Sequence, residues 1–186
     1  MTVPVIATLI RVLWVAAEYL HQRRHPVRPA QDWDRKSAVL WDAANVVEPA
    51  GMILGFVGFG QMRVGGGLVG WFGLALLVAG VAVRRHAVRT LGKFFTGTVV
   101  IRDDHRLVRA GLYRHVRHPA YAGALLAHLG LGLSFSNWFT LAFSVVPYSV
   151  AAAYRIRIEE RALREAFGED YADYARRTKR LIPGVY

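Results

Sequence analysis

A polar and basic stretch of the sequence, residues 104–123 (DHRLVRAGLYRHVRHPAYAG), carries side chains that could hold an anionic ligand. His118 and Pro119 stand where an apolar segment begins, and the fixed φ and missing N–H of proline suit the first turn of a helix. His118 and Tyr121 are three residues apart, so they share a face of that turn. Because the N-terminal end of a helix attracts negative charge, this junction is predicted to be a site for an anionic group.

A second group of charged residues lies near the end of the chain. Arg155 and Glu159 are four residues apart, and so are Glu160 and Arg164. This spacing is typical of ion pairs on a helix surface, each worth roughly a few tenths of a kcal/mol. Taken alone, the pattern favours that structural interpretation over a catalytic one.

No metal site is predicted. His115 and His118 have a spacing compatible with two metal ligands, but no further histidine or acidic cluster completes a set. The chain has no cysteine, which excludes disulfides, cysteine–metal sites and thiol nucleophiles.

The composition predicts one all-α integral membrane domain, residues 1–186, rather than a nucleic-acid-binding protein. The chain is 54% hydrophobic and yet carries a formal net charge of +11. Of its 24 Lys and Arg residues, 22 fall in segments 21–37, 84–118 and 155–186, between or after apolar blocks. The five blocks expected to cross the membrane are about residues 3–20, 39–62, 66–83, 121–135 and 138–154. The basic segments are expected in the cytoplasm and the N-terminus outside.

Polar residues inside these blocks suggest either buried pairing or a substrate cavity. Asp42, Asn45 and Glu48 recur every three residues, and Arg11 lies about midway along the first block. Since consecutive spans run antiparallel, Arg11 and Glu48 could meet near the middle of the membrane, where buried charges normally pair. A structural pair and a cavity lining are both left open. His128 is expected to be a packing histidine.

The loop and the tail have their own local signals. Residues 98–101 (TVVI) could form a brief extended segment. Gly168 is expected to end a helix, and a second short helix would then carry Tyr171 and Tyr174 on one face.

The loop and the tail together resemble the isoprenylcysteine carboxyl methyltransferases and their prokaryotic relatives. The resemblance rests on LGKFFT, HRLVRAGLYRHVRHPAYAG and RIRIEERALREAFGEDYADYARRTKRLIP, in this order, over about residues 91–183. Phospholipid N-methyltransferases share the RHP-x-Y-x-G and Glu-Glu elements. The first three spans, residues 1–83, resemble nothing beyond the general topology, so residues 84–186 would form the catalytic half with two further spans.

The resemblance implies an enzyme that uses S-adenosylmethionine, enclosed by the cytosolic loop and C-terminal helices, and a tunnel that admits a lipophilic or prenylated acceptor from the membrane lipids. Arg155 would grip the acceptor carboxylate, and together with Glu159 it would form the catalytic pair. The residues implied to bind the cofactor are His105, Arg106, Leu107, Val108, Tyr113, His118, Pro119, Ala120, Tyr121 and Glu159. The expected location is a prokaryotic cell membrane with the active site facing the cytoplasm.

The chemistry of the acceptor separates the competing functions. A carboxylate is ionised near pH 7 and needs no general base, whereas an amine would need one, and Glu159 or Glu160 would then be the candidate. A carboxylate suits Arg155, whose fork can bind both oxygens. The alternatives are a phospholipid N-methyltransferase, an NADPH-dependent enzyme similar to sterol reductases, and a membrane scaffold without activity. Neither the acceptor nor the oligomeric state can be read from the sequence.

Overall fold

Within the residues that the structure describes, five helices form a bundle. The computed structural model describes residues 2–24, 34–63, 67–96, 99, 101, 104–182 and 184. The helices are α1 (Thr2–Arg24), α2 (Asp34–Val57), α3 (Leu68–Leu91), α4 (Pro119–Ser134) and α5 (Trp138–Arg177), with two short 3₁₀ turns, η1 (Gly92–Phe94) and η2 (Gly111–Arg114). Within these residues, β pairing is limited to the isolated bridges Gln61–Asn137 and Val116–Lys179. The prediction of an all-α fold is confirmed.

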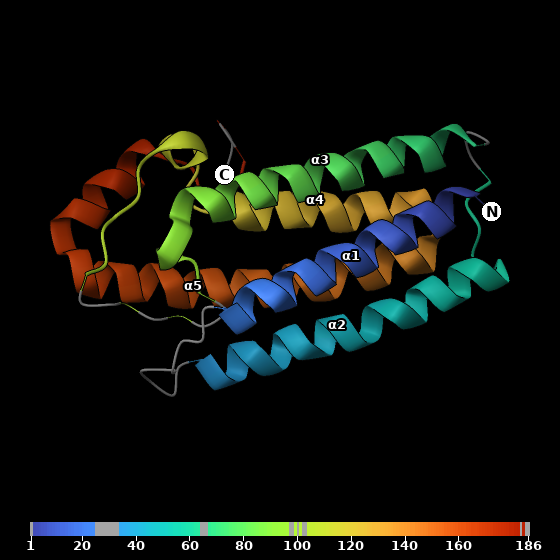
Figure 1. Ribbon diagram of the computed structural model, residues 1–186, viewed down its shortest axis with the longest axis horizontal. Coiled ribbons are helices and arrows are strands. Elements are labelled where there is room, and N and C mark those ends of the chain that lie inside the picture. Colours follow the sequence, from blue (N-terminus) through green and yellow to red (C-terminus); the bar gives the residue numbers. More distant parts are fainter. Residues whose placement is uncertain are drawn as a thin grey trace.

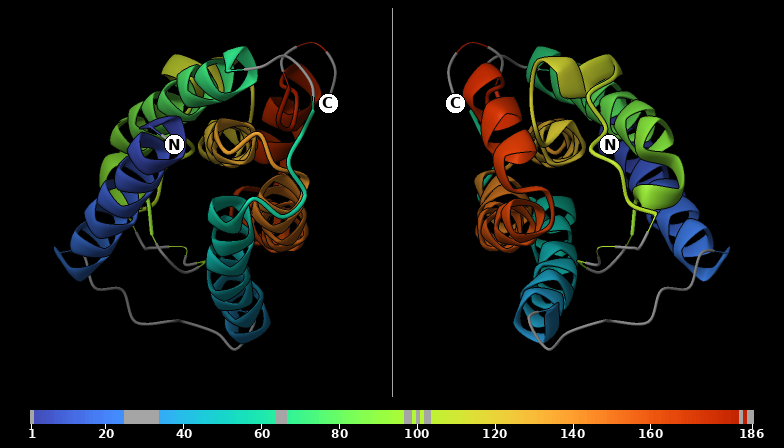
Figure 2. Two further views of the ribbon diagram at one scale, coloured as in Figure 1. Left: turned by 90° about the vertical axis from the view of Figure 1, so that its right-hand side faces the viewer. Right: turned by 90° about the vertical axis from the view of Figure 1, so that its left-hand side faces the viewer.

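The helices run lengthwise, and the two ends of the bundle differ (Figure 1). One end holds the N-terminus and the short connections that follow α2 and α4. These connections bind each other, because Met62 N donates to Ser136 O (2.7 Å) and Trp138 N donates to Gly60 O (3.0 Å). The opposite end holds the segment between α3 and α4 and the C-terminal part of α5. Figure 2 shows α2 beside α5 and α3 beside α4, with α1 lying apart from α2.

Three of the described helices are long and apolar enough to cross a membrane, in segments Thr2–His21, Leu68–Phe94 and Trp138–Arg177. Large apolar side chains on their outer faces are exposed. Such exposure is favourable in contact with lipid and unfavourable in contact with water. The fourth predicted span, α4, has only 16 residues, and the second, α2, carries Asp42 and Glu48. The structure therefore supports three of the five predicted spans, while the other two and the sidedness stay predictions.

Glycine geometry fixes several helix boundaries. The second predicted block, 39–62, extends too far, because α2 ends at Val57 and Gly58 and Gly60 adopt φ near +80°. The predicted stop at Gly168 is confirmed: its φ of +50° breaks α5, and the last part of the helix turns away from the bundle axis (Figure 1). Tyr171 and Tyr174, predicted to share one face of the helix after this break, have ring centroids 6.1 Å apart, and both are buried. Positions 98 and 100 of the predicted extended segment lie outside the described residues.

α3 and α4 pack at backbone distance through small residues. A Cβ added at Gly80 would lie 2.4 Å from Ala127 N, and one added at Gly130 would lie 2.2 Å from Leu77 N. Helices in lipid gain little from the hydrophobic effect, so such close packing is what holds the pair together. The contact fixes α4, whose first turn carries His118 and Pro119.

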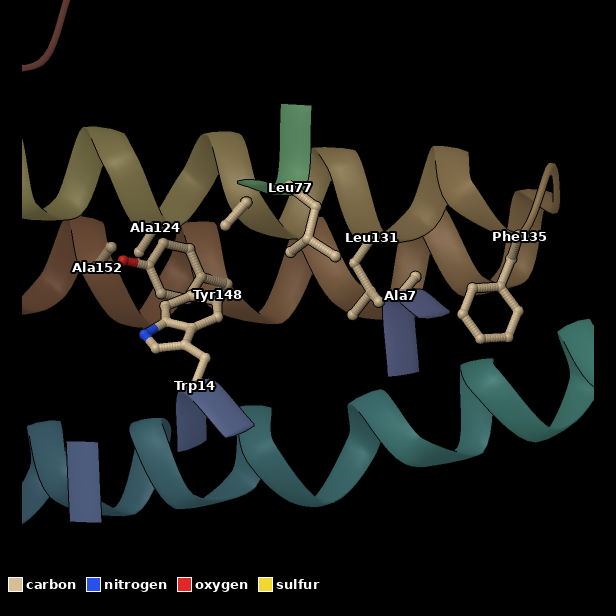
Figure 3. Close-up of a cluster of buried hydrophobic side chains, with 9 residues drawn as sticks. Ala7, Trp14, Leu77, Ala124, Leu131, Phe135, Tyr148 and Ala152 are labelled. Carbon is tan, nitrogen blue, oxygen red and sulfur yellow. The ribbon is translucent and has the colours of Figure 1, made fainter. Parts of the chain in front are cut away.

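The centre of the bundle joins α1 to α3, α4 and α5. Leu77 and Leu131 are fully buried there, and Figure 3 shows Trp14 of α1 and Tyr148 of α5 in the same cluster. The His128 ring of α4 contacts both, with centroids 5.5 Å from Trp14 and 4.3 Å from Tyr148, so these aromatic contacts place α1 against the bundle. The other buried members of the cluster are Ala7, Ala124, Ala127, Phe135 and Ala152.

Replacement of Gly130 by alanine is expected to force α3 and α4 apart. The new methyl group would collide with the backbone of Leu77, so the free energy of unfolding should fall by about 1–3 kcal/mol. Thermal unfolding in detergent measures the effect. The matched control is Gly67→Ala, because a Cβ there meets nothing within 4 Å and φ is −70°. Equal melting temperatures for the two variants would contradict the packing role.

Candidate functional site

One cavity of about 900 Å³ gathers nearly all the predicted site residues. Its walls come from α1, α2, the end of α3, the segment between α3 and α4, α4 as far as His128, and α5. Pro119 is the exception among the predicted residues: it lies fully buried in the first turn of α4. The predicted residues that line the cavity are His105, Arg106, Leu107, Val108, Tyr113, His118, Ala120, Tyr121, Arg155 and Glu159.

The carboxylate of Glu159 is held at the cavity wall by three side chains. It accepts a hydrogen bond from the Tyr121 hydroxyl. His118 Nδ1 lies 3.6 Å from one of its oxygens, and Arg155 Nε lies 3.5 Å from the other. His118 and Tyr121 thus act from one face of the first turn of α4, as their spacing predicts. The arrangement fixes Glu159 while leaving a quarter of its side chain exposed to the cavity.

Glu160 has a different role from the one that its spacing suggests. The predicted pair with Arg164 is present, since Arg164 Nη2 lies 4.0 Å from Glu160 Oε2, but Glu160 does not lie on the surface, because it is only 3% exposed. Its oxygens also accept hydrogen bonds from Arg117 Nε (3.1 Å) and Arg180 Nη2 (2.7 Å). His118 Nε2 lies 3.3 Å away. These partners come from distant parts of the chain, which a spacing rule within one helix cannot detect.

The C-terminal segment after α5 is part of this end of the site. Arg117 N donates to Lys179 O (2.8 Å) and His118 N donates to Arg180 O (3.1 Å), while Lys179 N donates to His115 O (3.1 Å). The main chain before α4 is therefore fixed by the tail as well as by side chains.

The surroundings of His118 favour its charged form. Burial alone would lower the pKa of the His118 imidazole, but its interactions with Glu159 and Glu160 outweigh burial and raise that pKa above its ordinary value. Each ring nitrogen faces a carboxylate, so the protonated ring satisfies both. His115, the other half of the possible metal pair, is exposed.

The polar end of the cavity also has flat apolar surfaces. The His105 ring lies 4.8 Å from the ring of Phe94 and 5.7 Å from that of Phe167, measured between centroids. Tyr113 is buried, burial raises the pKa of its hydroxyl, and its carbonyl accepts a hydrogen bond from the Tyr174 hydroxyl (2.8 Å). Aromatic walls beside a fixed carboxylate suit a ligand with a planar ring and cationic groups.

At the membrane end of the cavity, the predicted Arg11–Glu48 pair is present. Arg11 Nη2 lies 2.7 Å from Glu48 Oε2 and 3.1 Å from Asn45 Oδ1, and all three residues also line the cavity. The two open interpretations, buried pairing and cavity lining, therefore both hold. His128 packs as predicted, with its ring stacked 4.3 Å from Tyr148, but it also lies 3.5 Å from Glu48 Oε1.

A second buried ion pair was not predicted. Arg84 binds both oxygens of Glu18 at 2.7 Å, and its Nη1 donates to the carbonyl of Ala120 (3.3 Å). Hydropathy places Arg84 in the loop, because the apolar block ends at residue 83. Helical periodicity could have identified it as a buried helix residue, because Leu77, Gly80, Arg84 and Ala87 fall at intervals of three or four and are all buried. Arg84 thereby ties α1 and α3 to the turn that carries His118.

Comparisons with known proteins agree on one family. The model of the isoprenylcysteine carboxyl methyltransferase family matches residues 73–165, half of the chain. Protein-S-isoprenylcysteine O-methyltransferase B of Arabidopsis thaliana is 37% identical over 61% of this chain and 59% of its own length. A probable protein-S-isoprenylcysteine O-methyltransferase of Oryza sativa subsp. indica is 36% identical over 63% of this chain and 62% of its own length. The chain thus spans about three fifths of the length of these curated relatives.

The fold has a counterpart among solved structures. A eukaryotic intramembrane Ras methyltransferase, an isoprenylcysteine carboxyl methyltransferase, superposes with a TM-score of 0.60 and 24% identity, over 81% of this chain and 53% of that one. This likeness concerns the fold alone. The relatives named above are plant proteins and this structure is eukaryotic, so they give no support to the prediction of a prokaryotic membrane.

The paired carboxylates around His118 predict a pH-dependent stability. Because its pKa is raised in the folded protein, the stabilisation is complete below the ordinary pKa of about 6.5 and is lost as pH rises through the raised value. Melting temperatures of the wild type and of His118→Gln should therefore converge as pH increases above about 6.5.

The control is His115→Gln, three residues earlier and exposed, which should keep the wild-type profile. A difference between wild type and His118→Gln that is constant from acid to alkaline pH would contradict the charged interaction.

Proposed function

The chain belongs to the isoprenylcysteine carboxyl methyltransferase family, and on this premise we propose that it methylates the carboxylate of a lipophilic, isoprenylcysteine-type acceptor with S-adenosylmethionine as donor. The active site would be the polar end of the cavity, around Arg155 and Glu159. The five predicted spans and a cytoplasmic position of this end are part of the proposal, and the 22 basic residues that the sequence places in segments 21–37, 84–118 and 155–186 support it.

The observation that carries the proposal is the continuity of the cavity. The same cavity is lined by the buried Arg155 and by Val12, Val15 and Asn45, which are exposed on the sides of α1 and α2. An amphiphile could therefore leave the bilayer between these helices and bring its carboxylate to Arg155. At about 900 Å³ the cavity is at the large end of the usual range for ligand sites, as two ligands would require.

The residues at the polar end fit the proposed cofactor. The segment from His105 to Val108, Tyr113 and the turn at His118 would surround it, and Glu159 would contact its polar part. When bound, S-adenosylmethionine supplies a methyl group on a positively charged sulfur. Glu159 offers a carboxylate that three neighbours hold in place, so its position does not depend on the ligand.

The local charges favour a carboxylate acceptor over an amine. The guanidinium groups of Arg117, Arg155 and Arg180 and the charged ring of His118 surround the carboxylates of Glu159 and Glu160. Positive charge therefore exceeds negative charge, so an anionic acceptor beside Arg155 would be attracted and an ammonium acceptor repelled, whereas the cationic groups of the cofactor would lie against Glu159. Arg155 would orient the acceptor carboxylate, and the apolar walls would exclude water. An ionised carboxylate then needs no proton transfer.

Methyl transfer from radiolabelled S-adenosylmethionine to N-acetyl-S-farnesylcysteine, in nanodiscs, tests the function directly. We expect a methyl ester that alkali releases as labelled methanol. Label in phosphatidylethanolamine instead would replace the proposal with N-methylation. Binding of NADPH without methyl transfer would favour the reductase alternative.

Glu159→Gln is expected to weaken binding of S-adenosylhomocysteine by about tenfold or more, because a charge-assisted contact is lost. Isothermal titration calorimetry measures the affinity. Glu165→Gln, on an exposed part of the same helix, is the matched control and should bind as the wild type does. Equal affinities in the two variants would argue against contact between Glu159 and the cofactor.

Arg155→Lys is expected to lower kcat/KM for the farnesyl acceptor by about tenfold to a hundredfold, because lysine cannot form the two-pronged contact. Affinity for S-adenosylhomocysteine should change little. The control, Arg157→Lys, lies two residues away on the exposed face of α5. If Arg155→Lys instead binds S-adenosylhomocysteine more weakly but keeps the wild-type kcat, Arg155 contacts the cofactor rather than the acceptor.

A further inference from the structure

The membrane end of the cavity contains two buried polar atoms that make no hydrogen bond within the described residues. His128 is 6% exposed and Ser144 is 2% exposed, and both line the cavity. Neither His128 Nδ1, which lies 3.5 Å from Glu48 Oε1, nor the Ser144 hydroxyl makes a hydrogen bond there. Leaving such groups without a hydrogen bond is unfavourable, so a ligand that bonds to both is favoured.

The Ser144 hydroxyl is unusual among hydroxyls in these helices. Ser134 donates to the carbonyl of Gly130 (2.7 Å) and Ser149 donates to that of Val145 (2.6 Å), each four residues earlier. That local bond is the default for a serine within a helix. Ser144 makes no such bond in the described structure, although it lies in the same helix as Ser149. Its hydroxyl is therefore available to a ligand in the cavity.

Helix register brings these atoms to one level of the cavity. Thr140 Oγ1 donates to Gly51 O (2.8 Å), which fixes α5 antiparallel to α2. One turn further along α5, Ser144 lies opposite the turn of α2 that carries Glu48. Glu48 in turn lies 3.5 Å from His128 Nδ1. Helix register thus places polar side chains of α2, α4 and α5 at one level of the cavity that all three line.

The charge of this group restricts what it can bind. Glu48 is already paired with Arg11 at 2.7 Å, so the two charges cancel. A further charged group in the membrane interior would be uncompensated and costly. A neutral hydroxyl or similar oxygen group can both donate and accept, so it can satisfy His128 and Ser144 together.

We propose that the membrane end of the cavity, through Ser144, His128 and Glu48, binds a neutral oxygen group carried within the lipophilic tail of the acceptor. The inference rests on the proposed function, because it takes Arg155 as the site of the acceptor carboxylate. Ser144 and Arg155 are eleven residues apart on one helix, which is about 16 Å. That length corresponds to about a dozen single bonds of an extended chain, so the preferred acceptor carries its oxygen group about that far from its carboxylate.

A pair of synthetic ligands tests the inference by binding alone. The first is N-acetylcysteine with a saturated twelve-carbon S-alkyl tail, and the second bears a hydroxyl on about the ninth tail carbon, counted from sulfur. Titration calorimetry on the S-adenosylhomocysteine-loaded protein in nanodiscs gives both affinities. We expect the hydroxylated ligand to bind about tenfold more tightly, since it satisfies buried polar atoms. In Ser144→Ala the preference should disappear, whereas the control Ser149→Ala should keep it.

An entirely apolar tunnel would bind the hydroxylated ligand more weakly than the saturated one, because the hydroxyl would lose its hydrogen bonds to water and gain none in the cavity. Weaker binding of the hydroxylated ligand by the wild type would therefore overturn the inference. A preference that survives in Ser144→Ala would overturn it too, as would absence of binding by both ligands.

Methyl transfer to N-acetyl-S-farnesylcysteine is measured alongside. Transfer without a hydroxyl preference would leave the proposed function standing and overturn the inference. A hydroxyl preference that depends on Ser144, without any transfer, would keep the polar binding site but overturn the proposed function.

Discussion

The imidazole of His118 is the link on which the polar end of the molecule depends. Its two nitrogens face the carboxylates of Glu159 and Glu160, consecutive residues that point to different surroundings. Glu159 reaches the cavity, and Glu160 is buried against the C-terminal tail through Arg180. One ring therefore sets the first turn of α4, the C-terminal part of α5 and the tail relative to each other. The charged cluster that results is structural, and in the proposed function it also borders the reaction site.

The same requirement, that buried charges be paired, explains how α1 joins the bundle. Arg11 of α1 binds Glu48 of α2, and Glu18 of α1 binds Arg84 of α3. Dispersion and small-residue packing hold α3 to α4, whereas α1 adds two ion pairs to its apolar contacts. Both pairs line the cavity, so the wall nearest the membrane is positioned largely by electrostatics.

The sequence predicted the helical fold, the break at Gly168 and the Arg11–Glu48 pair because these follow from periodicity, glycine stereochemistry and charge pairing. It also predicted nearly all the residues that gather at the cavity, since their motifs are continuous in the chain. The burial of Glu160 was missed because Arg117 and Arg180 approach from elsewhere. Local spacing alone does not contain that information. The Glu18–Arg84 pair was missed because hydropathy places an arginine in a loop even where a helix buries it.

The family match begins in α3, at residue 73, and so leaves α1 and α2 outside it. His118, Arg155 and Glu159 lie inside the match, whereas Arg11 and Glu48 lie before it. The cavity nevertheless uses both parts for its walls. In the proposed function, the residues that would bind the cofactor and the acceptor carboxylate thus lie in the part that matches the family, whereas the chamber for the lipophilic tail takes part of its wall from α1 and α2. Substitutions in these two helices would reshape that chamber without replacing His118, Arg155 or Glu159.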